Sequence, residues 1–584
     1  MSILSNTGIR AGASVVSGGY EIEKSLRFNS DEGAYLDWTP SSAGNLKTFT
    51  LSWWMKRCQI DTNQRIFAVA LGASQFSLMF DALGRLYFYG NVSNPTGAFE
   101  RTTEWSFRDF SAWYHVVLSI DTTQGTDSDR FKMYVNGEEI TSFVYSSYPA
   151  QNTEMWWNRA TNLKIGGTSS YKFDGYLAEV FHVDGQALSA SDFGETNAAT
   201  GQWLPKDCSG DLTYGTNGFY LKFDNISDLG EDSSGEDNDW TSNNFGATSY
   251  DGPWSADGSY TNSPTGPWSK AFDNDMGSYD KGVRTYSTSD STFTFDVNNR
   301  PTWSNKIEIF FRKYSGTANV NGGSDFTTLI TGTPASYWEG WLDISSIAGS
   351  SGTLSTIYIS DVGSNYVSLQ GIRLDGRMLL DGVASPSPIS IDTPTTFDDE
   401  GNGTGNYATL NPLNPGASTL SNGNLEASGT GDLPTIIPGS GQWYYEIDGT
   451  GYDWDGTVDD FTDAAGVYNF GQRPFEETVT TGYLALNTYN LDTTKILSGT
   501  YEGNGDADGP VIWMNATPAT LRISSTNDPP EAGDAVTFSL TTVDRLAGGF
   551  KIRNATTNNA NGTTYYWSAT STRAFKHANA QSNE

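Results

Sequence analysis

The sequence contains little cysteine, little histidine and no long apolar run. Only Cys58 and Cys208 are present among 584 residues, so a disulfide framework is excluded and folding with reduced thiols is the simpler expectation. The three histidines, His115, His182 and His577, form no His-x-x-x-His pair, so the usual zinc-hydrolase pattern is missing. No stretch approaches the ~20 apolar residues of a membrane span, so membrane insertion is not expected.

Basic residues and an export signal are scarce as well. The N-terminal stretch MSILSNTGIRAGAS lacks the apolar segment of a secretory signal, so export by the general secretory route is not expected. Lysine and arginine total 34 against 68 aspartates and glutamates, a formal net charge of −34. This charge repels phosphate backbones, which argues against nucleic acid as a partner.

Glycine and aromatic residues are abundant instead. The chain has 63 Gly, 18 Trp, 30 Tyr and 30 Phe residues. Aromatic strands separated by polar, glycine-containing turns predict an all-β fold class. The length predicts three to five domains of ~100 to 200 residues each.

The clearest local pattern runs from Trp113 to Ile140. Apolar residues alternate over WYHVVLSID and again over FKMYV, which is the period of two that strands show. Asn136-Gly137 follows, and this pair tolerates positive φ at both centres of a two-residue type I′ turn. The stretch therefore predicts strands folded back on one another in a sandwich.

Changes in composition divide the chain into seven predicted segments. Two are linkers, one because of its acidic, Gly-Ser-punctuated sequence and the other because of its prolines. The segments are an N-terminal docking arm (1–21), a first sandwich (22–205), an acidic linker (206–250), a jelly-roll domain (251–384), a second linker (385–407), a further β-domain (408–500) and a small C-terminal β-domain (501–584).

Several dispersed segments of the first domain occur in the order of a known superfamily. They are SLRFNSDEGAYLDWTPSSAGNLKTFTLSWWMKR, WYHVVLSID, FKMYVNGEEI, LKIGG and FDGYLAEVFHVDG. With them, residues 22–205 resemble the concanavalin A-like or laminin-G-like superfamily as it occurs in bacteriophage structural proteins. The resemblance implies a jelly-roll sandwich of the type that binds carbohydrate.

Two further segments carry resemblances. LSNGNLEASG, WYYEIDGTG, NFGQRPF and GYLALNTYNL are similar to the SPRY-type sandwich of marine phage fibre proteins. WSKAFDNDMGS and LQGIRLDG are similar to discoidin-like, galactose-binding jelly rolls. Together the resemblances imply a multi-domain fibre, spike or appendage protein of a virion.

The spacing of carboxylates in the sequence tests one enzymatic alternative, a retaining glycosidase. A retaining glycosidase needs two carboxyl groups ~5 to 5.5 Å apart, and the glucanase pattern places three acids on one strand. Glu446 and Asp448 match the first two, but Gly451 stands where the acid/base is needed. We therefore predict no catalytic residues and no enzymatic activity.

Calcium is the one cofactor that the sequence suggests. Asn504, Asp506 and Asp508 precede Gly509 in the spacing of an Asp-x-Asp-x-Asp-Gly loop, where alternate side chains converge on one ion. Asp273 and Asp275 form a weaker candidate. The alternative is a plain loop whose side chains bond their own backbone.

Sugar binding needs an aromatic ring to stack on C–H groups beside amides or carboxylates that reach hydroxyls. Two clusters have this composition, and both would act only if exposed; as core residues they would be structural. The candidates are Trp156, Trp157 and Asn158 in the first cluster and Tyr452, Asp453 and Trp454 in the second.

These observations favour a tailed-bacteriophage virion protein, assembled in the host cytoplasm and released by lysis. The predicted function is a fibre or spike that docks on other virion proteins through its N-terminal arm and binds host-surface polysaccharide. A homo-trimer or other homo-oligomer is expected from the resemblance. The alternatives are a capsid or tail decoration protein that braces the particle, and a glycan-degrading depolymerase.

Overall fold

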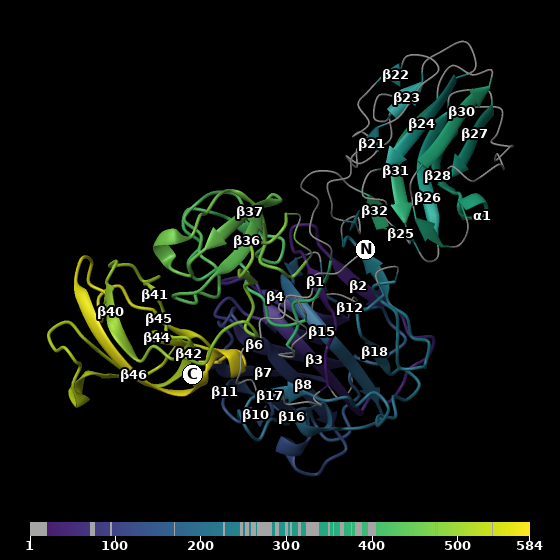
Figure 1. The fold of residues 1–584 in the computed structure, drawn as a ribbon. Helices are drawn as coiled ribbons and strands as arrows, with labels where there is room; N and C mark the ends of the chain where they lie inside the picture. Colours follow the sequence, from purple (N-terminus) through teal and green to yellow (C-terminus); the bar gives the residue numbers. More distant parts are fainter. Residues whose placement is uncertain are drawn as a thin grey trace.

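Strands form nearly all of the regular structure in the computed structural model (Figure 1). It describes residues 20–245, 388–394 and 404–583, apart from gaps at 70–75, 94–95, 169, 226–227, 474, 476 and 540, and only short segments between 249 and 379. The single α-helix in these residues is α1 (Ser345–Ala348), and none of their helices is long and apolar enough to cross a bilayer. The predicted all-β class is confirmed.

The first sandwich consists of two eight-stranded sheets, which we call sheet A and sheet B. Sheet A contains β1 (Ser25–Phe28), β3 (Thr48–Arg57), β8 (Tyr114–Asp121), β9 (Phe131–Val135), β10 (Glu138–Glu139), β15 (Gly175–Asp184), β18 (Phe219–Leu221) and β33 (Ile389–Ser390). Its order is β10-β9-β8-β3-β15-β1-β33, and β18 also pairs with β15.

Sheet B lies across the core from sheet A. It contains β2 (Tyr35–Trp38), β4 (Gln64–Val69), β5 (Phe76–Phe80), β6 (Arg85–Ser93), β7 (Thr96–Ser106), β11 (Phe143–Ser146), β12 (Leu163–Ile165) and β19 (Thr241–Asn243). Its order is β11-β7-β6-β5-β4-β12-β2-β19. Two short pairs complete this part: β13 (Gly167–Thr168) with β14 (Tyr171–Lys172), and β16 (Gly194–Thr196) with β17 (Trp203–Pro205).

The predicted hairpin is confirmed. Both turn residues have positive φ, 48° at Asn136 and 86° at Gly137, and β9 pairs with β10 across them. A Cβ atom on Gly137 would lie 2.5 Å from the ring of Trp203, so the turn also needs glycine for space. This hairpin therefore lies directly under a side chain of β17.

Residues 206–245, most of the segment 206–250 that is predicted as a linker, belong instead to the first sandwich. Its β18 pairs with β15 and its β19 pairs with β2. Trp240 is buried and packs edge-on against Phe219, with ring centroids 5.0 Å apart. The acidic residues are turn residues, since Asp232 accepts hydrogen bonds from the backbone N–H groups of Tyr220 and Asn238.

The described strands between 249 and 379 form separate sheets (Figure 1). One contains β20 (Ser249–Tyr250), β22 (Pro264–Thr265), β23 (Val283–Thr285), β26 (Ile307–Lys313), β28 (Trp338–Asp343), β31 (Val367–Leu374) and β32 (Arg377–Leu379). Another contains β21 (Ala256–Asp257), β24 (Ser291–Val297), β27 (Thr317–Gly322) and β30 (Thr356–Val362), and β25 (Thr302–Trp303) pairs with β29 (Gly352–Thr353).

Two further units follow, which we call the central block (404–491) and the C-terminal sandwich (498–574). The central block contains β34 (Leu420–Ser421), β35 (Glu426–Ala427), β36 (Trp443–Ile447), β37 (Thr450–Trp454), β38 (Gly466–Asn469) and β39 (Leu484–Ala485). The C-terminal sandwich pairs β40 (Ser498–Glu502), β42 (Ala516–Ser524), β43 (Ala535–Val536) and β46 (Thr564–Ala574), and separately β41 (Val511–Trp513), β44 (Val543–Leu546) and β45 (Gly549–Ile552).

Short 3₁₀ turns connect several of these strands. They are η1 (Asp127–Asp129), η2 (Ala190–Asp192), η4 (Val458–Asp460), η5 (Ala532–Asp534) and η6 (Phe575–His577).

The segment 385–407, predicted as a second linker, joins the first sandwich to the central block. Its β33 extends sheet A beside β1, and Asp392 then forms a fully buried ion pair of 2.8 Å with Lys56 of β3. Lys56 also donates to the Asn406 side chain and to the backbone carbonyl of Tyr407. Residues 395–403, and the proposed docking arm over residues 1–19, lie outside the described residues.

A turn of the central block also contacts the first sandwich. Asn422, Gly423 and Asn424 have φ values of 59°, 68° and 58°, so three successive residues are left-handed. The turn presents two carbonyl groups: Arg27 donates to that of Asn422, and Tyr176 donates to that of Gly423. The sandwich thus recognises the backbone of this turn.

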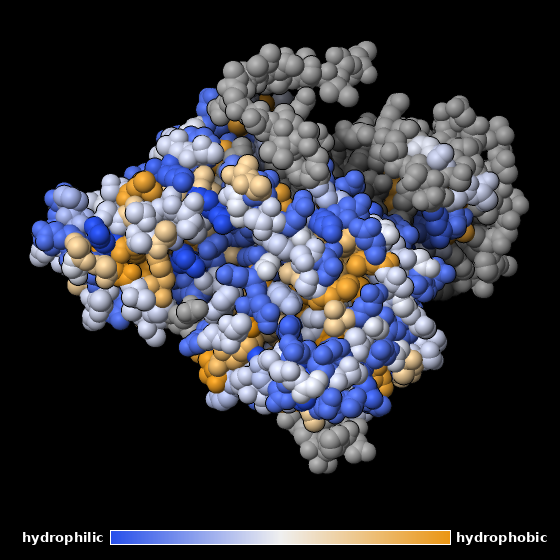
Figure 2. All heavy atoms as spheres, turned by 90° about the horizontal axis from the view of Figure 1, so that it is seen from below, coloured by the Kyte–Doolittle hydropathy of each residue, from blue (hydrophilic) through white to orange (hydrophobic). Residues whose placement is uncertain are grey.

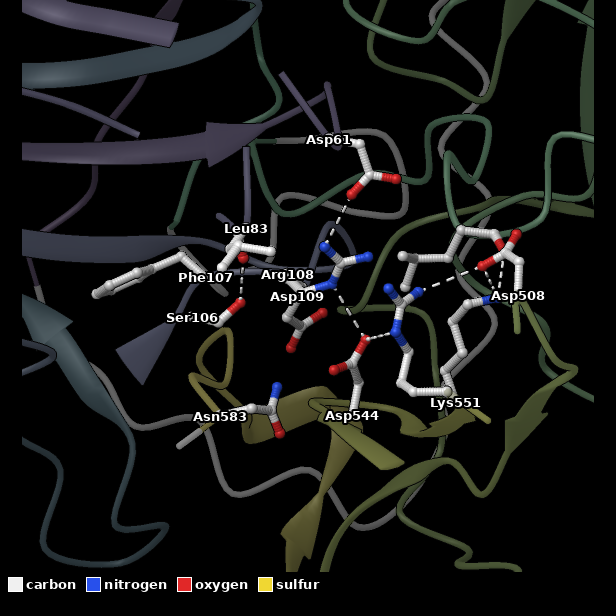
Figure 3. A network of polar contacts seen from close by, with 12 residues as sticks. Asp61, Leu83, Ser106, Phe107, Arg108, Asp109, Asp508, Asp544, Lys551 and Asn583 are labelled. Atoms are coloured by element: carbon white, nitrogen blue, oxygen red, sulfur yellow. Dashed lines mark hydrogen bonds and ion pairs between the residues drawn. The ribbon is translucent and has the colours of Figure 1, made fainter. Parts of the chain in front are cut away.

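The C-terminal sandwich joins the first sandwich through charges and a returning tail (Figure 3). Arg108 pairs with the buried Asp544 at 3.3 Å and with Asp61 at 3.1 Å. The tail (575–583) then runs back to sheet A: Ala580 donates its N–H to the carbonyl of Trp113, and Asn136 donates to the carbonyl of Ala580.

Gly423→Ala tests the junction with the central block. A Cβ atom there would lie 2.7 Å from Cδ of Arg27 and 2.8 Å from the Tyr176 hydroxyl, at φ +68°. We expect the free energy of unfolding to fall by about 2 to 4 kcal/mol, since strain and a clash add. Gly562→Ala is the matched control: its φ is +70° and it meets nothing within 4 Å, so it measures strain alone. Equal losses for both variants in urea unfolding would contradict the clash.

Candidate functional site

The outer face of sheet B carries a row of tyrosines. Along β6, Leu86 and Phe88 point into the core, whereas Tyr87 and Tyr89 alternate with them and are partly exposed. The two tyrosine rings lie side by side, with centroids 6.5 Å apart and planes inclined by 24°. The same period of two that builds the core therefore places two aromatic rings at the surface.

Cross-strand neighbours extend this row. Tyr87 lies opposite Thr102 of β7 and Met79 of β5, and Met79 lies opposite Arg65 of β4. At the β11 edge, Tyr145 lies opposite Thr102. Directly opposed residues share a face of the sheet, so these side chains form one surface that crosses four strands and reaches a fifth.

Polar groups lie beside the rings. Ser77 and Glu100 flank Tyr89 on the neighbouring strands. Arg65 donates from Nε to the Ser77 hydroxyl at 2.8 Å, and its guanidinium lies 5.1 Å from the ring centroid of Tyr171. We call this surface, formed by Tyr87, Tyr89, Tyr145, Tyr171, Arg65, Ser77 and Glu100, the tyrosine face.

The environment of Tyr87 keeps its hydroxyl protonated at neutral pH. Burial, Glu100 and Tyr89 together raise the pKa of Tyr87 to about 12, against the opposing charge of Arg65. Burial lowers the pKa of Arg65, and Tyr171 and Tyr87 oppose this. The face can therefore both donate and accept hydrogen bonds at neutral pH.

Large apolar side chains are otherwise seldom exposed. Tyr145 is 58% and Tyr171 37% exposed, and both belong to the tyrosine face. On the surface drawn in Figure 2, hydrophobic residues form small patches among hydrophilic ones. The remaining exposed large apolar residues in the described parts are Leu83, Val144, Val458, Ile496 and Leu497.

A comparison with protein families identifies the unit that carries this face. Residues 30–192 match the family model Laminin_G_3, described as the concanavalin A-like lectin/glucanases superfamily. The first sandwich is a concanavalin A-like, laminin-G-like domain. Its fold is that of lectins and glucanases, and the match covers the strands of the tyrosine face. No curated protein matches the chain.

Among solved structures, the chain has distant similarities. A native heptameric SAP-like pentraxin from Limulus polyphemus is 17% identical over 29% of this chain and 78% of its own, with a TM-score of 0.23. The Ruminococcus gnavus IT-sialidase CBM40 bound to α2,6-sialyllactose is 16% identical over 30% and 93%, with a TM-score of 0.20. Trypanosoma rangeli sialidase is 17% identical over 25% and 22%, with a TM-score of 0.18. All three TM-scores lie below 0.5.

The structure buries most of the first predicted sugar cluster. Trp157 is fully buried among Phe67 and Phe76, and Asn158 is fully buried and donates to Asp184 at 2.6 Å. These two residues hold loops together and cannot reach a ligand. Trp156 is partly exposed and lies against the guanidinium of Arg159, 4.9 Å from the ring centroid.

The residues of the second predicted sugar cluster also differ in their exposure. Trp454 is buried, packs against Tyr445 and Phe461, and donates from its indole to the carbonyl of Thr457 at 2.7 Å. Its expected role at an exposed site is therefore wrong. Tyr452 is partly exposed and stacks on Tyr445, and Asp453 is the exposed residue of the three.

One side chain of the predicted calcium loop, Asp508, forms an ion pair with an internal cation (Figure 3). The ammonium of Lys551 lies 3.0 Å from Asp508 and donates to the carbonyls of Leu413 and Gly509. Asn504 and Asp506 accept backbone N–H groups two residues further on, as the plain loop alternative requires. No cluster of metal-ligating side chains occurs in the described residues, and a calcium ion would meet a buried ammonium. Asp273 and Asp275 lie outside the described residues.

The two carboxylates that match the glucanase pattern form hydrogen bonds within the central block. Glu446 is buried and accepts hydrogen bonds from Asn469 and from the N–H of Glu477. Asp448 accepts the N–H of Val467 at 2.8 Å. These side chains stabilise the central block, and Glu446 is not available to a sugar.

Sequence reasoning missed the tyrosine face, although a signal exists. The strand RLYFYG has aromatic residues at both alternating positions, so one aromatic set must face away from the core. That excess distinguishes β6 from an ordinary strand with one polar face. Both predicted loop clusters contain tryptophan, which is highly buried on average, and Trp157 and Trp454 are indeed buried.

A buried polar cluster around Glu179 lies on the face of sheet A that points away from sheet B. Glu179 is 3% exposed at a bulge of β15, with φ +49°. It accepts hydrogen bonds from Tyr220 at 2.6 Å and from Tyr20 at 3.1 Å. Burial raises the pKa of Glu179 to about 7, and the two tyrosine hydrogen bonds oppose this shift.

This pKa predicts how stability depends on pH. Between the usual value of 4.5 and about 7 the folded state holds a proton that the unfolded state releases, so the free energy of unfolding should fall as the pH rises. We expect Glu179→Gln to remove a decline of up to about 3 kcal/mol, measured by urea unfolding from pH 5 to pH 8. Glu195→Gln, an exposed change on β16, is the control, and parallel pH profiles for wild type and Glu179→Gln would contradict the prediction.

The internal ammonium predicts that calcium has no stabilising effect. Adding EDTA or millimolar calcium should leave the Tm of the full chain unchanged, because Lys551 already neutralises Asp508. Lys551→Gln should lower the Tm, since the carbonyls of Leu413 and Gly509 lose a charged donor. A calcium-dependent rise in the Tm of the wild-type protein would show that a loop ion is bound after all.

Proposed function

We propose that this protein binds carbohydrate, without cleaving it, on the tyrosine face of its laminin-G-like domain. The observation that carries the proposal is the pair of stacked, partly exposed rings of Tyr87 and Tyr89 beside polar side chains of the same sheet surface. Tyrosine rings stack on the apolar C–H side of a sugar while their hydroxyls bond its edge. Arg65, Ser77 and Glu100 supply the donors and acceptors that orient such a ligand.

The proposal extends to a structural role in a tailed bacteriophage particle. Its support is the sequence resemblance to phage fibre proteins, together with the carbohydrate-binding type of fold. An arm at residues 1–21 would dock on other virion proteins, and a homo-trimer would present several tyrosine faces to host-surface polysaccharide. Repeated copies would raise the apparent affinity of a weak site.

A second candidate function is bracing of the particle without receptor binding. The burial of Trp157 and Trp454 favours it, because a receptor site built on the predicted tryptophan clusters would expose these rings. The two candidates differ in whether the tyrosine face contacts a glycan or a neighbouring virion protein. A depolymerase, the remaining alternative, would release reducing sugar ends from host polysaccharide on long incubation.

Tyr89→Ala tests the glycan site. The full chain is first screened against an array of neutral and acidic oligosaccharides, and the best ligand is then titrated by calorimetry. We expect the variant to bind about tenfold more weakly, which corresponds to about 1.4 kcal/mol. Tyr483→Ala, at a partly exposed tyrosine of the central block, should bind normally. Equal affinities for the wild type and both variants would move the site elsewhere.

The virion role is tested on particles. Purified full-length protein is added to host cells before phage, and particles are labelled with antibody against the laminin-G-like domain. Blocked adsorption with label at the tail supports the receptor role. Label spread over the head, with unchanged adsorption, supports bracing instead.

A further inference from the structure

A lysine, an aspartate and an asparagine meet in the buried junction between the laminin-G-like domain and the central block. The ammonium Nζ of Lys56 lies 2.8 Å from Oδ2 of Asp392 and 3.0 Å from Oδ1 of Asn406. The side chains of Lys56 and Asp392 are fully buried, and Asn406 is 5% exposed. The junction therefore brings an amine, a carboxylate and a primary amide into contact away from solvent.

The amide of Asn406 is fixed in its orientation. Its Nδ2 donates to the backbone carbonyl of Ser111 at 2.8 Å, so that Oδ1 points toward the ammonium of Lys56. The carbonyl carbon Cγ is one bond away from Oδ1, and the hydrogen bond from Nζ to Oδ1 polarises that carbon. The folded chain thus holds an amine beside an amide carbonyl, which replaces a bimolecular encounter by a reaction within one molecule.

The carboxylate of Asp392 is placed to move protons. Its Oδ1 accepts the indole N–H of Trp113 at 3.0 Å and the backbone N–H of Tyr407 at 3.2 Å, while its Oδ2 faces the ammonium. Burial raises the pKa of Asp392, against the ammonium of Lys56 and the two N–H donors. A carboxylate whose charge is disfavoured by burial can take a proton from the ammonium, and the neutral amine that results is a nucleophile.

We propose that Lys56 and Asn406 form an intramolecular isopeptide bond, with Asp392 as the acid–base catalyst. The Lys56 ammonium transfers one proton to Asp392, and the amine lone pair then attacks Cγ of Asn406. Asp392 passes that proton to Nδ2 and takes a second one from Nζ, while the bond between Cγ and Nδ2 breaks and Nδ2 leaves as ammonia. Asp392 ends as a neutral acid, so the reaction needs no oxidant, reductant or further reactant.

The isopeptide bond fastens the chain between two residues that lie 350 positions apart. The closed loop contains most of the laminin-G-like domain and the described sheets between 249 and 379. Tension applied to the two ends of the chain passes directly from β3 to the central block, so the loop carries no load. Because the reacting atoms come from both units, the bond forms only after these units have folded together. It does not depend on sugar binding at the tyrosine face.

Mass spectrometry of the denatured full chain tests the bond. We expect the wild-type mass to be lower than that of its sequence by one ammonia, and digestion with trypsin and chymotrypsin to give a branched peptide that joins Lys56 to Asn406. Asn406→Ala, which keeps the ion pair but removes the amide, should have its full calculated mass. Asp392→Ala, which removes the acid–base group, should also stay unlinked, and circular dichroism checks that each variant folds. Asn411→Ala, at another buried asparagine of the central block, should be linked like the wild type.

Lys551 is an internal control in the same digest, because its buried ammonium contacts Asp508 and two backbone carbonyls. Peptides that end at Lys551 should be recovered unlinked. Folded wild-type protein of full mass overturns the proposal, and so does a loss of ammonia that maps to another asparagine. Loss of water in place of ammonia would put the bond on Asp392 and overturns it as well. A linked Asp392→Ala variant would refute the catalytic role of the carboxylate.

Discussion

The buried ion pair between Lys56 and Asp392 is the constraint on which the architecture depends. Neither side chain is exposed, and a charge moved out of water costs several kcal/mol unless its whole shell is satisfied. The indole of Trp113 completes the shell of Asp392, and the carbonyl of Tyr407 completes that of Lys56. The laminin-G-like domain and the entry to the central block must therefore fold together, because either alone would leave a charge unpaired.

Similar contacts join the C-terminal sandwich. Asp544 is buried between Arg108 and Arg553, and Asp109 accepts the N–H groups of Ala547 and Gln581. The tail then returns to the hairpin around Asn136, so the end of the chain is fastened to its first domain. A chain that reads as a string of modules forms a connected body in these three parts. The junctions between these parts consist of ion pairs and of hydrogen bonds to backbone groups. Both depend on distance and angle more strongly than apolar contacts do.

This arrangement decides where binding is feasible. Junctions cover the outer side of sheet A with β17, the tail and the segment after β18, and they bury the imidazole of His115 between Ser52 and Trp203. On the outer face of sheet B, Tyr87 and Tyr89 are partly exposed, with ring centroids 6.5 Å apart and planes inclined by 24°.

The sequence by itself determined the all-β class, the strands of Trp113 to Ile140 and the Asn136-Gly137 turn, because alternation and turn chemistry involve neighbouring residues. It also carried enough spaced motifs to indicate the concanavalin A-like domain. Tertiary structure decided the rest. Residues 219–221 and 241–243 of the acidic segment form strands because they pair with β15 of sheet A and β2 of sheet B. Lys551, which lies 43 residues beyond Asp508, forms an ion pair with that aspartate of the predicted calcium loop. Which aromatic rings are exposed also depends on tertiary packing. Trp157 is enclosed by Phe67 and Phe76, which are distant in sequence, whereas Tyr87 and Tyr89 stay partly exposed on the outer face of sheet B. Local periodicity follows from the order of residues alone. Burial and charge pairing depend on which distant residues the folded chain places next to one another.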